Sequence, residues 1–197
     1  MKKKIITTVS VTSVILVVVW ICFVINANNK WTLPQTIYYS EGYTAEYESD
    51  IYYSISESRD GYSAVLKNAY IIDMDSFLEQ YKLTEEIFEN RSFIPQSVYC
   101  VEIEFFNTDN ITSGIDLINM RLSCKSCVLE ISNELWDAIY PNLAGQSGFK
   151  LRENSSKTML LPYVFVSPDY ETMKYDNLHW ELNLSQYPTK KIMYVEF

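Results

Sequence analysis

The chain has 197 residues, is 48% hydrophobic and 15% aromatic, and carries a formal net charge of −9 with a single histidine, His179. This length fits one domain with a substantial core. The acidic balance argues against nucleic acid as a partner, and one histidine limits the catalytic centres that depend on an imidazole.

The N-terminus carries a long apolar run that predicts a transmembrane helix. Lys2, Lys3 and Lys4 precede an uncharged stretch from Ile5 to Ile25. As a helix, these 21 residues extend about 32 Å, which matches the hydrocarbon core of a bilayer. Lysines before a span favour the cytoplasmic side. The sequence therefore predicts a lysine cluster and signal-anchor over residues 1–27, a single pass through the plasma membrane, and an extracytoplasmic remainder.

A cleaved signal peptide is the alternative interpretation of this run. The apolar region of a signal peptide has about 7–15 residues and ends in a small-x-small site. Here the run is longer, and its candidate site, Ile25-Asn26-Ala27, has a bulky residue three positions before the cut. The length of the run therefore favours an anchor over a secreted factor.

The part beyond the predicted anchor is strongly acidic. The 16 basic residues less the three N-terminal lysines leave 13, against all 25 acidic residues, a balance of −12. Such a surface repels nucleic acid, although solubility alone also accounts for it.

Residues 28–60 are predicted to form a juxtamembrane linker and a tyrosine-rich segment. Seven of the 16 tyrosines fall between residues 37 and 62. Tyrosine combines a flat apolar face with a hydroxyl, so it suits both sugar stacking and protein interfaces. The alternative is an edge segment whose rings pack onto the domain. The predicted binding surface consists of Tyr38, Tyr39, Tyr43, Tyr47, Tyr52 and Tyr53.

Residues 61–197 have the pattern of a mainly β domain. In residues 98–106, apolar and polar side chains alternate with period two, which is typical of a half-buried strand. The apolar face holds Tyr99, Val101, Ile103 and Phe105, and the solvent-exposed face holds Cys100, Glu102 and Glu104. Short helices are predicted at residues 76–82, 84–90 and 134–140, the first capped by Asp75 or Ser76 and the third started by Ser132 or Asn133. Strands and helices do not alternate as in βαβ units. The predicted elements therefore favour an immunoglobulin-like antiparallel β-sandwich with short helical insertions. Its other strands are predicted at residues 62–72, 115–122, 128–131, 158–166, 178–184 and 190–197.

The sequence contains no recognisable catalytic motif. It has no G-x-S-x-G, P-loop or G-x-G-x-x-G pattern, and His179 is predicted on the solvent-exposed face of a strand. We therefore predict a non-enzymatic protein with no catalytic residue, no cofactor and no bound metal.

Three cysteines beyond the anchor, Cys100, Cys124 and Cys127, are candidates for a disulfide or for thiols. With His179 they are enough for one Cys₃His zinc site, but outside the cytoplasm a disulfide is favoured. Cys124 and Cys127 can pair only across a turn, because in a strand their Cα atoms lie about 10 Å apart. Pairing of Cys100 with either is equally allowed, and three structural thiols are a further alternative.

Several segments together resemble a known family. They are Gly61-Tyr62-Ser63, Asp75–Tyr81, Val98–Asn107 and the final Tyr187-Pro188-Thr189-Lys190-Lys191. The chain is similar to membrane-anchored proteins of Gram-positive bacteria that share domain of unknown function 5028. The likeness covers residues 35–197 and the anchor. It implies a surface location and a β-sandwich, it brings no activity or cofactor, and the C-x-x-C is not a feature associated with that family.

These features predict a membrane-anchored cell-surface module that binds a protein or glycan partner or supports a neighbouring envelope machine. One alternative is a small extracytoplasmic redox or metal-binding protein that uses the C-x-x-C. The other is a cleaved, secreted binding factor.

Overall fold

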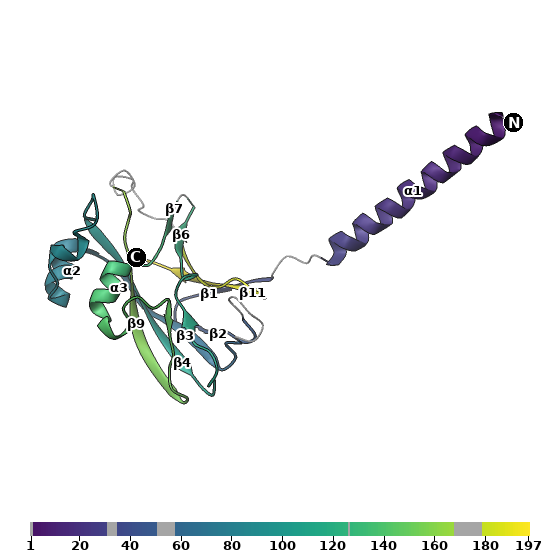
Figure 1. Ribbon diagram of the computed structural model, residues 1–197. Helices are drawn as coiled ribbons and strands as arrows, with labels where there is room; N and C mark the ends of the chain where they lie inside the picture. The colour runs from purple at the N-terminus through teal and green to yellow at the C-terminus, as the bar shows by residue number, and fades with distance from the viewer. Residues whose placement is uncertain (1, 31–34, 51–57, 126, 168–178) are drawn as a thin grey trace. The chain divides into compact units, whose positions relative to one another are not determined.

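The structure is a computed structural model that describes residues 2–30, 35–50, 58–125, 127–167 and 179–197 (Figure 1). Within the first helix, side chains are described for residues 13–28. The chain divides into two compact units, Met1–Pro34 and Gln35–Phe197.

The first unit contains one helix, α1 (Lys2–Lys30), which includes the whole predicted apolar run. Large apolar side chains such as Leu16 and Phe23 are exposed along it. Across the residues whose side chains are described, no helix reaches the length and apolarity that crossing a membrane requires.

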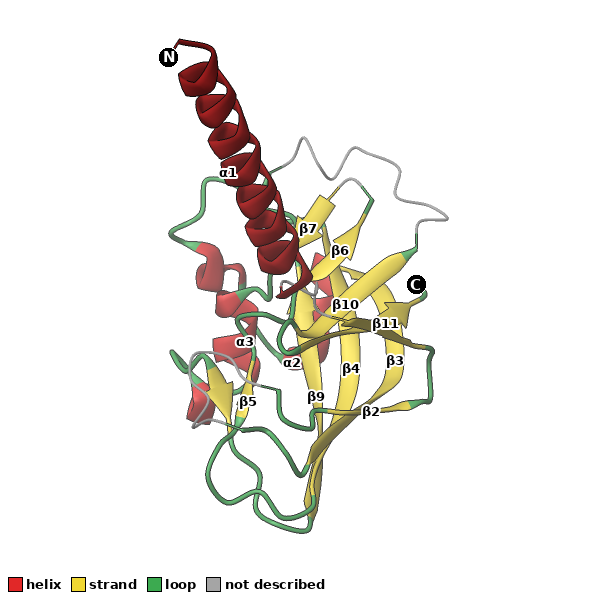
Figure 2. Cartoon of the chain, turned by 90° about the vertical axis from the view of Figure 1, so that its right-hand side faces the viewer, coloured by secondary structure: helices red, strands yellow, loops and turns green. Residues whose placement is uncertain are grey.

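The second unit is built on two β-sheets (Figure 2). The five-stranded sheet has the order β1 (Gln35–Tyr39), β11 (Thr189–Val195), β10 (Trp180–Ser185), β6 (Leu122–Cys124) and β7 (Cys127–Leu129). The four-stranded sheet has the order β2 (Thr44–Glu46), β3 (Tyr62–Asp73), β4 (Ser97–Asn107) and β9 (Ser155–Tyr163). A small ladder pairs β5 (Ile115–Asp116) with β8 (Gly148–Phe149).

The main core lies between the two sheets. Ile103 and Phe105 from β4 are fully buried in the same cluster as Leu182 from β10 and Met193 from β11. Each large apolar side chain that leaves water contributes about 1.5–3 kcal/mol. The period-two pattern therefore places these residues inward, and the prediction of a mainly β fold is confirmed.

Helices cover the other face of the four-stranded sheet. They are α2 (Met74–Tyr81), α3 (Asn133–Ile139) and the 3₁₀ turn η1 (Glu85–Phe88), whereas Leu143 of the 3₁₀ turn η2 (Pro141–Leu143) packs against the main core. Phe77 of α2 and Leu135 of α3 are buried in one cluster with Cys100 of β4. Cys100 was predicted on the solvent-exposed face of its strand. That prediction is wrong, because the helices cover this face and bury Cys100.

Helix α2 begins at Met74, two residues earlier than predicted. Asp73, in an extended conformation, caps it by accepting a hydrogen bond from the Ser76 backbone N–H at 2.9 Å. That hydrogen bond lowers the pKa of Asp73. The helix ends at Lys82, whose positive φ of 55° closes it.

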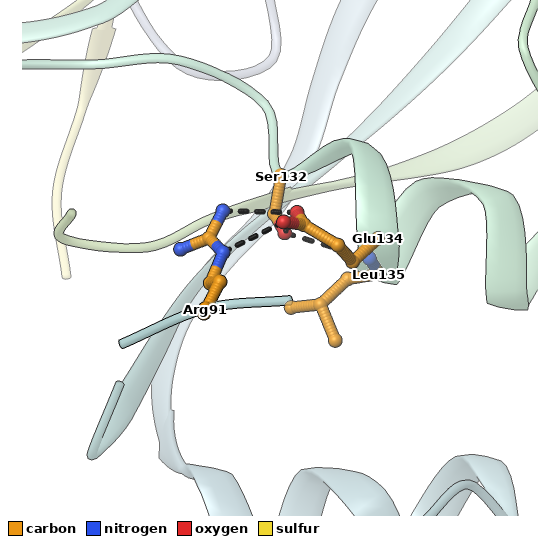
Figure 3. Close-up of polar contacts among 4 residues, drawn as sticks. All are labelled: Arg91, Ser132, Glu134 and Leu135. Carbon is orange, nitrogen blue, oxygen red and sulfur yellow. Dashed lines mark hydrogen bonds and ion pairs between the residues drawn. The ribbon is translucent and has the colours of Figure 1, made fainter. Parts of the chain in front are cut away.

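Helix α3 begins at a cap that a surface arginine reinforces (Figure 3). The Ser132 hydroxyl accepts from the Leu135 backbone N–H at 3.4 Å and donates to Glu134 at 2.9 Å. Arg91 donates twice to the Glu134 carboxylate, at 2.6 and 2.9 Å. The predicted helix start at residue 132 or 133 is thus confirmed, and Arg91 ties it to the segment after η1.

Three details of the predicted sandwich are corrected. β1 pairs parallel with β11, so the sandwich is not wholly antiparallel. Three consecutive strands, β2, β3 and β4, lie side by side next to β9, whereas in an immunoglobulin sheet of order ABED no more than two consecutive strands are neighbours. The predicted strand at residues 115–122 breaks into β5 and β6, because Asp116 accepts from the Ile118 backbone N–H and starts a turn.

Candidate functional site

The tyrosine-rich segment enters the fold as β1, at the edge of the five-stranded sheet. In the parallel register, Tyr38 lies opposite Ile192 and Tyr39 opposite Met193. Because side chains alternate along a strand, the two tyrosines face opposite ways. Tyr38 is 50% exposed, and Tyr39 packs against the main core.

Tyr38 stacks on a tyrosine from the opposite end of the chain. Its ring centroid lies 5.2 Å from that of Tyr194 on β11, and the two ring planes are 9° apart. Tyr194 is itself 39% exposed. Such a pair adds about 0.5–1.5 kcal/mol beyond the area it buries. It holds two phenol rings in a fixed orientation on the outer face of the sheet.

Three carboxylates line the same hollow as one ring of this pair, Tyr194. Tyr194 lines a hollow of about 610 Å³ together with Glu41, Glu181 and Glu196, and His179 lies at the same hollow. We call Tyr38, Tyr194, Glu41, Glu181 and Glu196 the tyrosine–glutamate surface. The faces of aromatic rings and ionised carboxylates both attract cations and hydrogen-bond donors. The arrangement is therefore suited to binding a positively charged group.

The other predicted tyrosines have different environments. Tyr43 is 68% exposed in the turn after β1, whereas Tyr47 is buried in the main core. Burial raises the pKa of Tyr47, with Arg59 opposing the shift, so it stays a neutral packing residue. Tyr52 and Tyr53 lie outside the described residues.

The cysteines separate into a pair and a single thiol. Cys124 and Cys127 are register partners in the β6–β7 hairpin, with their Sγ atoms 2.7 Å apart. Cys100 lies in the cluster beneath the helices, on the far face of the other sheet. Burial raises the pKa of its thiol to about 12. Pairing of Cys100 with either of the others is therefore corrected, because a whole sheet separates them.

The described residues contain no candidate metal centre. Within them, no three His, Cys, Asp or Glu side chains lie close enough together to hold an ion. His179 and Cys100, proposed as ligands of a shared zinc ion, lie apart, at the outer face of one sheet and under the helices of the other.

Comparison with protein families identifies the chain. A family model described as "Domain of unknown function (DUF5028)" matches residues 36–191. The chain belongs to this family. No curated protein and no solved structure matches it. The DUF5028 match includes Tyr38 and both cysteines of the hairpin, and it ends before Tyr194 and Glu196.

Of the five residues of the tyrosine–glutamate surface of this DUF5028 protein, the sequence analysis predicted one, Tyr38. Tyr38 belongs to the conspicuous tyrosine cluster, but Tyr194, Glu181 and Glu196 come from the last strands. One signal could have pointed to Tyr194. It is the aromatic residue between the buried Met193 and Val195, and period two therefore turns it outward.

Proposed function

We propose that this DUF5028 protein is a membrane-anchored, extracytoplasmic module that binds a basic segment of another protein through the tyrosine–glutamate surface, without catalysis. The observation that carries the proposal is the exposed, stacked pair Tyr38–Tyr194 beside three glutamates. Arginine and lysine side chains bind aromatic faces and carboxylates together, and aromatic residues dominate the energy of protein interfaces.

Charge favours a protein over a glycan as the partner. A neutral sugar needs a ring face and hydrogen-bond acceptors, but it gains nothing from the negative charge of three carboxylates that line one hollow. Desolvating those carboxylates is unfavourable unless the partner brings compensating positive charge. A basic protein segment supplies that charge and also guanidinium planes that stack on the phenol rings.

The proposed location rests on the N-terminal sequence. The uncharged run Ile5–Ile25 lies within α1 and follows three lysines. Its length suits a bilayer, and the lysines favour the cytoplasmic side. External protease added to intact cells tests this. We expect the full-length chain in membranes to lose its C-terminal unit. A chain in the medium that begins near residue 28 would support the secreted factor instead.

In-cell crosslinking of the full-length chain tests the binding surface. We expect Tyr38→Ala and Glu181→Gln each to reduce recovery of the principal crosslinked protein at least tenfold, as loss of an interface anchor predicts. Tyr43→Ala is the matched control, because Tyr43 is an exposed tyrosine of the same segment that lies outside the stacked Tyr38–Tyr194 pair and does not line the hollow. If all three variants recover the partner equally, binding does not occur at this surface.

A second readout separates the two kinds of partner. Recovery from cells whose surface glycans have been removed enzymatically should stay unchanged if the partner is a protein. If the unaltered chain, with Tyr38 and Glu181 in place, no longer recovers the partner from these deglycosylated cells, the partner is a glycan. Unfolding midpoints of the variants, measured in parallel, exclude loss of the fold as the cause.

A further inference from the structure

The β6–β7 hairpin brings two cysteines together that an extended chain would hold apart. Cys124 and Cys127 are antiparallel register partners, and such partners have Cα atoms about 4.5–5.5 Å apart. That separation lies inside the range of protein disulfides. Their sulfur atoms lie 2.7 Å apart, so closure requires little movement of the backbone.

We propose that Cys124 and Cys127 are a modification site: a reversible disulfide that closes the β6–β7 hairpin by exchange with an external disulfide. This inference is independent of the tyrosine–glutamate surface. It rests on the proposed extracytoplasmic location in one respect: the oxidant, an external disulfide, is available there, because disulfides form and persist outside the cytoplasm.

The third cysteine of the domain does not take part. Cys100 is fully buried beneath α2 and α3, whereas Cys124 and Cys127 are half-buried and pack against the core between the sheets. A reagent in solution therefore reaches the hairpin sulfurs without unfolding of the domain, but it does not reach Cys100.

The surroundings of the pair leave room for an exchange partner. Both cysteines line a hollow of about 690 Å³ beside Val128, which is 60% exposed, and Phe165. Lys125 also lines this hollow and brings a positive charge to its rim. A small disulfide can thus approach the sulfur atoms along an apolar surface.

The pair is suited to stable closure rather than to catalysis. Burial, together with the neighbouring Cys124 thiol, raises the pKa of Cys127 to about 12. Catalytic cysteines instead have lowered pKa values that keep a thiolate available. The driving force here is proximity: once one sulfur has reacted, the other is already in contact with it.

The exchange balances as two successive displacements. One cysteine thiolate attacks the external disulfide, forms a mixed disulfide and releases one external thiol. The second cysteine thiolate then attacks the bonded sulfur of the first, closes the Cys124–Cys127 bond and releases the second external thiol. Both cysteines are oxidised, the external disulfide is reduced to two thiols, and the two cysteine protons end on those thiols.

The location of the bond gives it a structural consequence. Among the residues that the structure describes, β7 is the edge strand of the five-stranded sheet and pairs with β6. Edge strands open readily because one of their sides lacks a ladder of hydrogen bonds. A covalent link between β6 and β7 would hold this edge closed and keep the wall of the hollow in place.

The full-length chain, solubilised in detergent, provides the test. Reduced protein is incubated with oxidised glutathione, unfolded, alkylated and examined by intact mass and peptide mapping. We expect the chain to lose the mass of two hydrogen atoms and two alkylation sites, with Cys124 and Cys127 in one linked peptide. Cys22 and Cys100 should remain alkylated.

Two variants sharpen the result. Cys100→Ser should close the bond as the unaltered chain does. Cys124→Ser should instead retain one glutathione on Cys127, because the resolving sulfur is gone. Alkylation of both Cys124 and Cys127 after glutathione treatment, a bond that involves Cys100, or glutathione retained on Cys124 or Cys127 of the unaltered chain would each overturn the proposal.

Discussion

Lys191 is a charged side chain held almost wholly out of water, with only 1% of its surface exposed. Its ammonium group donates to the Glu46 carbonyl and lies 2.8 Å from Asp50 and 3.1 Å from Glu48. Asp50 is equally buried, and burial raises the pKa of its carboxyl despite the opposing Lys191. Each of the two charges therefore depends on the other for compensation.

Removing one member of this pair should destabilise the fold strongly. We expect Lys191→Met to lower the free energy of unfolding by about 3–5 kcal/mol, because it leaves the Asp50 carboxyl buried without its cation. Urea denaturation at pH 7 measures this. The neighbouring Lys190 is exposed, so Lys190→Met should change the same quantity by less than about 0.5 kcal/mol.

The double variant Lys191→Met, Asp50→Leu tests whether the two buried charges compensate each other, because it removes both. Replacing a buried ion pair by apolar side chains is often neutral or stabilising. We therefore expect it to recover most of the stability lost in the single variant. If the two losses simply add, the pair does not act as a compensating unit.

At the scale of one element, helix α3 depends on contacts at its first turn. Partial burial alone would raise the pKa of Glu134, but hydrogen bonds from Arg91, the backbone and Ser132 outweigh it and lower the pKa. A carboxyl with a lowered pKa stabilises the fold above its ordinary value of 4.5. That contribution is lost as pH falls through the lowered folded-state pKa.

Arg91→Met should therefore act in a pH-dependent way. We expect a loss of about 1 kcal/mol near pH 7, because the pair is bidentate but only partly shielded from water. The difference from the unaltered chain should shrink as pH falls below 4.5 and Glu134 becomes protonated. Thermal unfolding across this pH range measures both effects.

A second ion pair supplies the control for that prediction. Arg121 and Glu130 are 3.0 Å apart, but both side chains are largely exposed. Arg121→Met should shift the unfolding free energy by only a few tenths of a kcal/mol at neutral pH. Equal losses in the two arginine variants would contradict a special role for the α3 cap.

At the scale of the whole molecule, the compact unit begins at Gln35 rather than at Gly61. The predicted linker, residues 28–60, contributes β1 to one sheet and β2 to the other. It also buries Ala45 and Tyr47 in the main core. The segment is thus a structural part of both layers.

Shortened chains test this boundary. A chain that starts at Lys30 should unfold at the same temperature as the full-length protein, because it retains every strand of the second unit. A chain that starts at Gly61 should lose cooperative unfolding, since it lacks two strands and a buried tyrosine that alone contributes about 1.5–3 kcal/mol. Cooperative unfolding of the shorter chain would restore the linker interpretation.

The sequence by itself determined the features that depend on near neighbours along the chain. The alternation in residues 98–106 predicted β4, Ser132 was among the predicted caps of α3, and the quoted segments identified the DUF5028 family. Strand periodicity and helix caps are local, because they arise from backbone geometry and hydrogen bonds that span a few residues.

Only the tertiary structure decided which residues from distant parts of the chain meet. It brought Tyr194 beside Tyr38, Asp50 beside Lys191, and Cys100 under two helices instead of into water. These outcomes depend on strand order and on which face each layer covers. A period-two pattern marks the two faces of a strand, but it does not say what will cover either of them, because burial is a property of the assembled sheets.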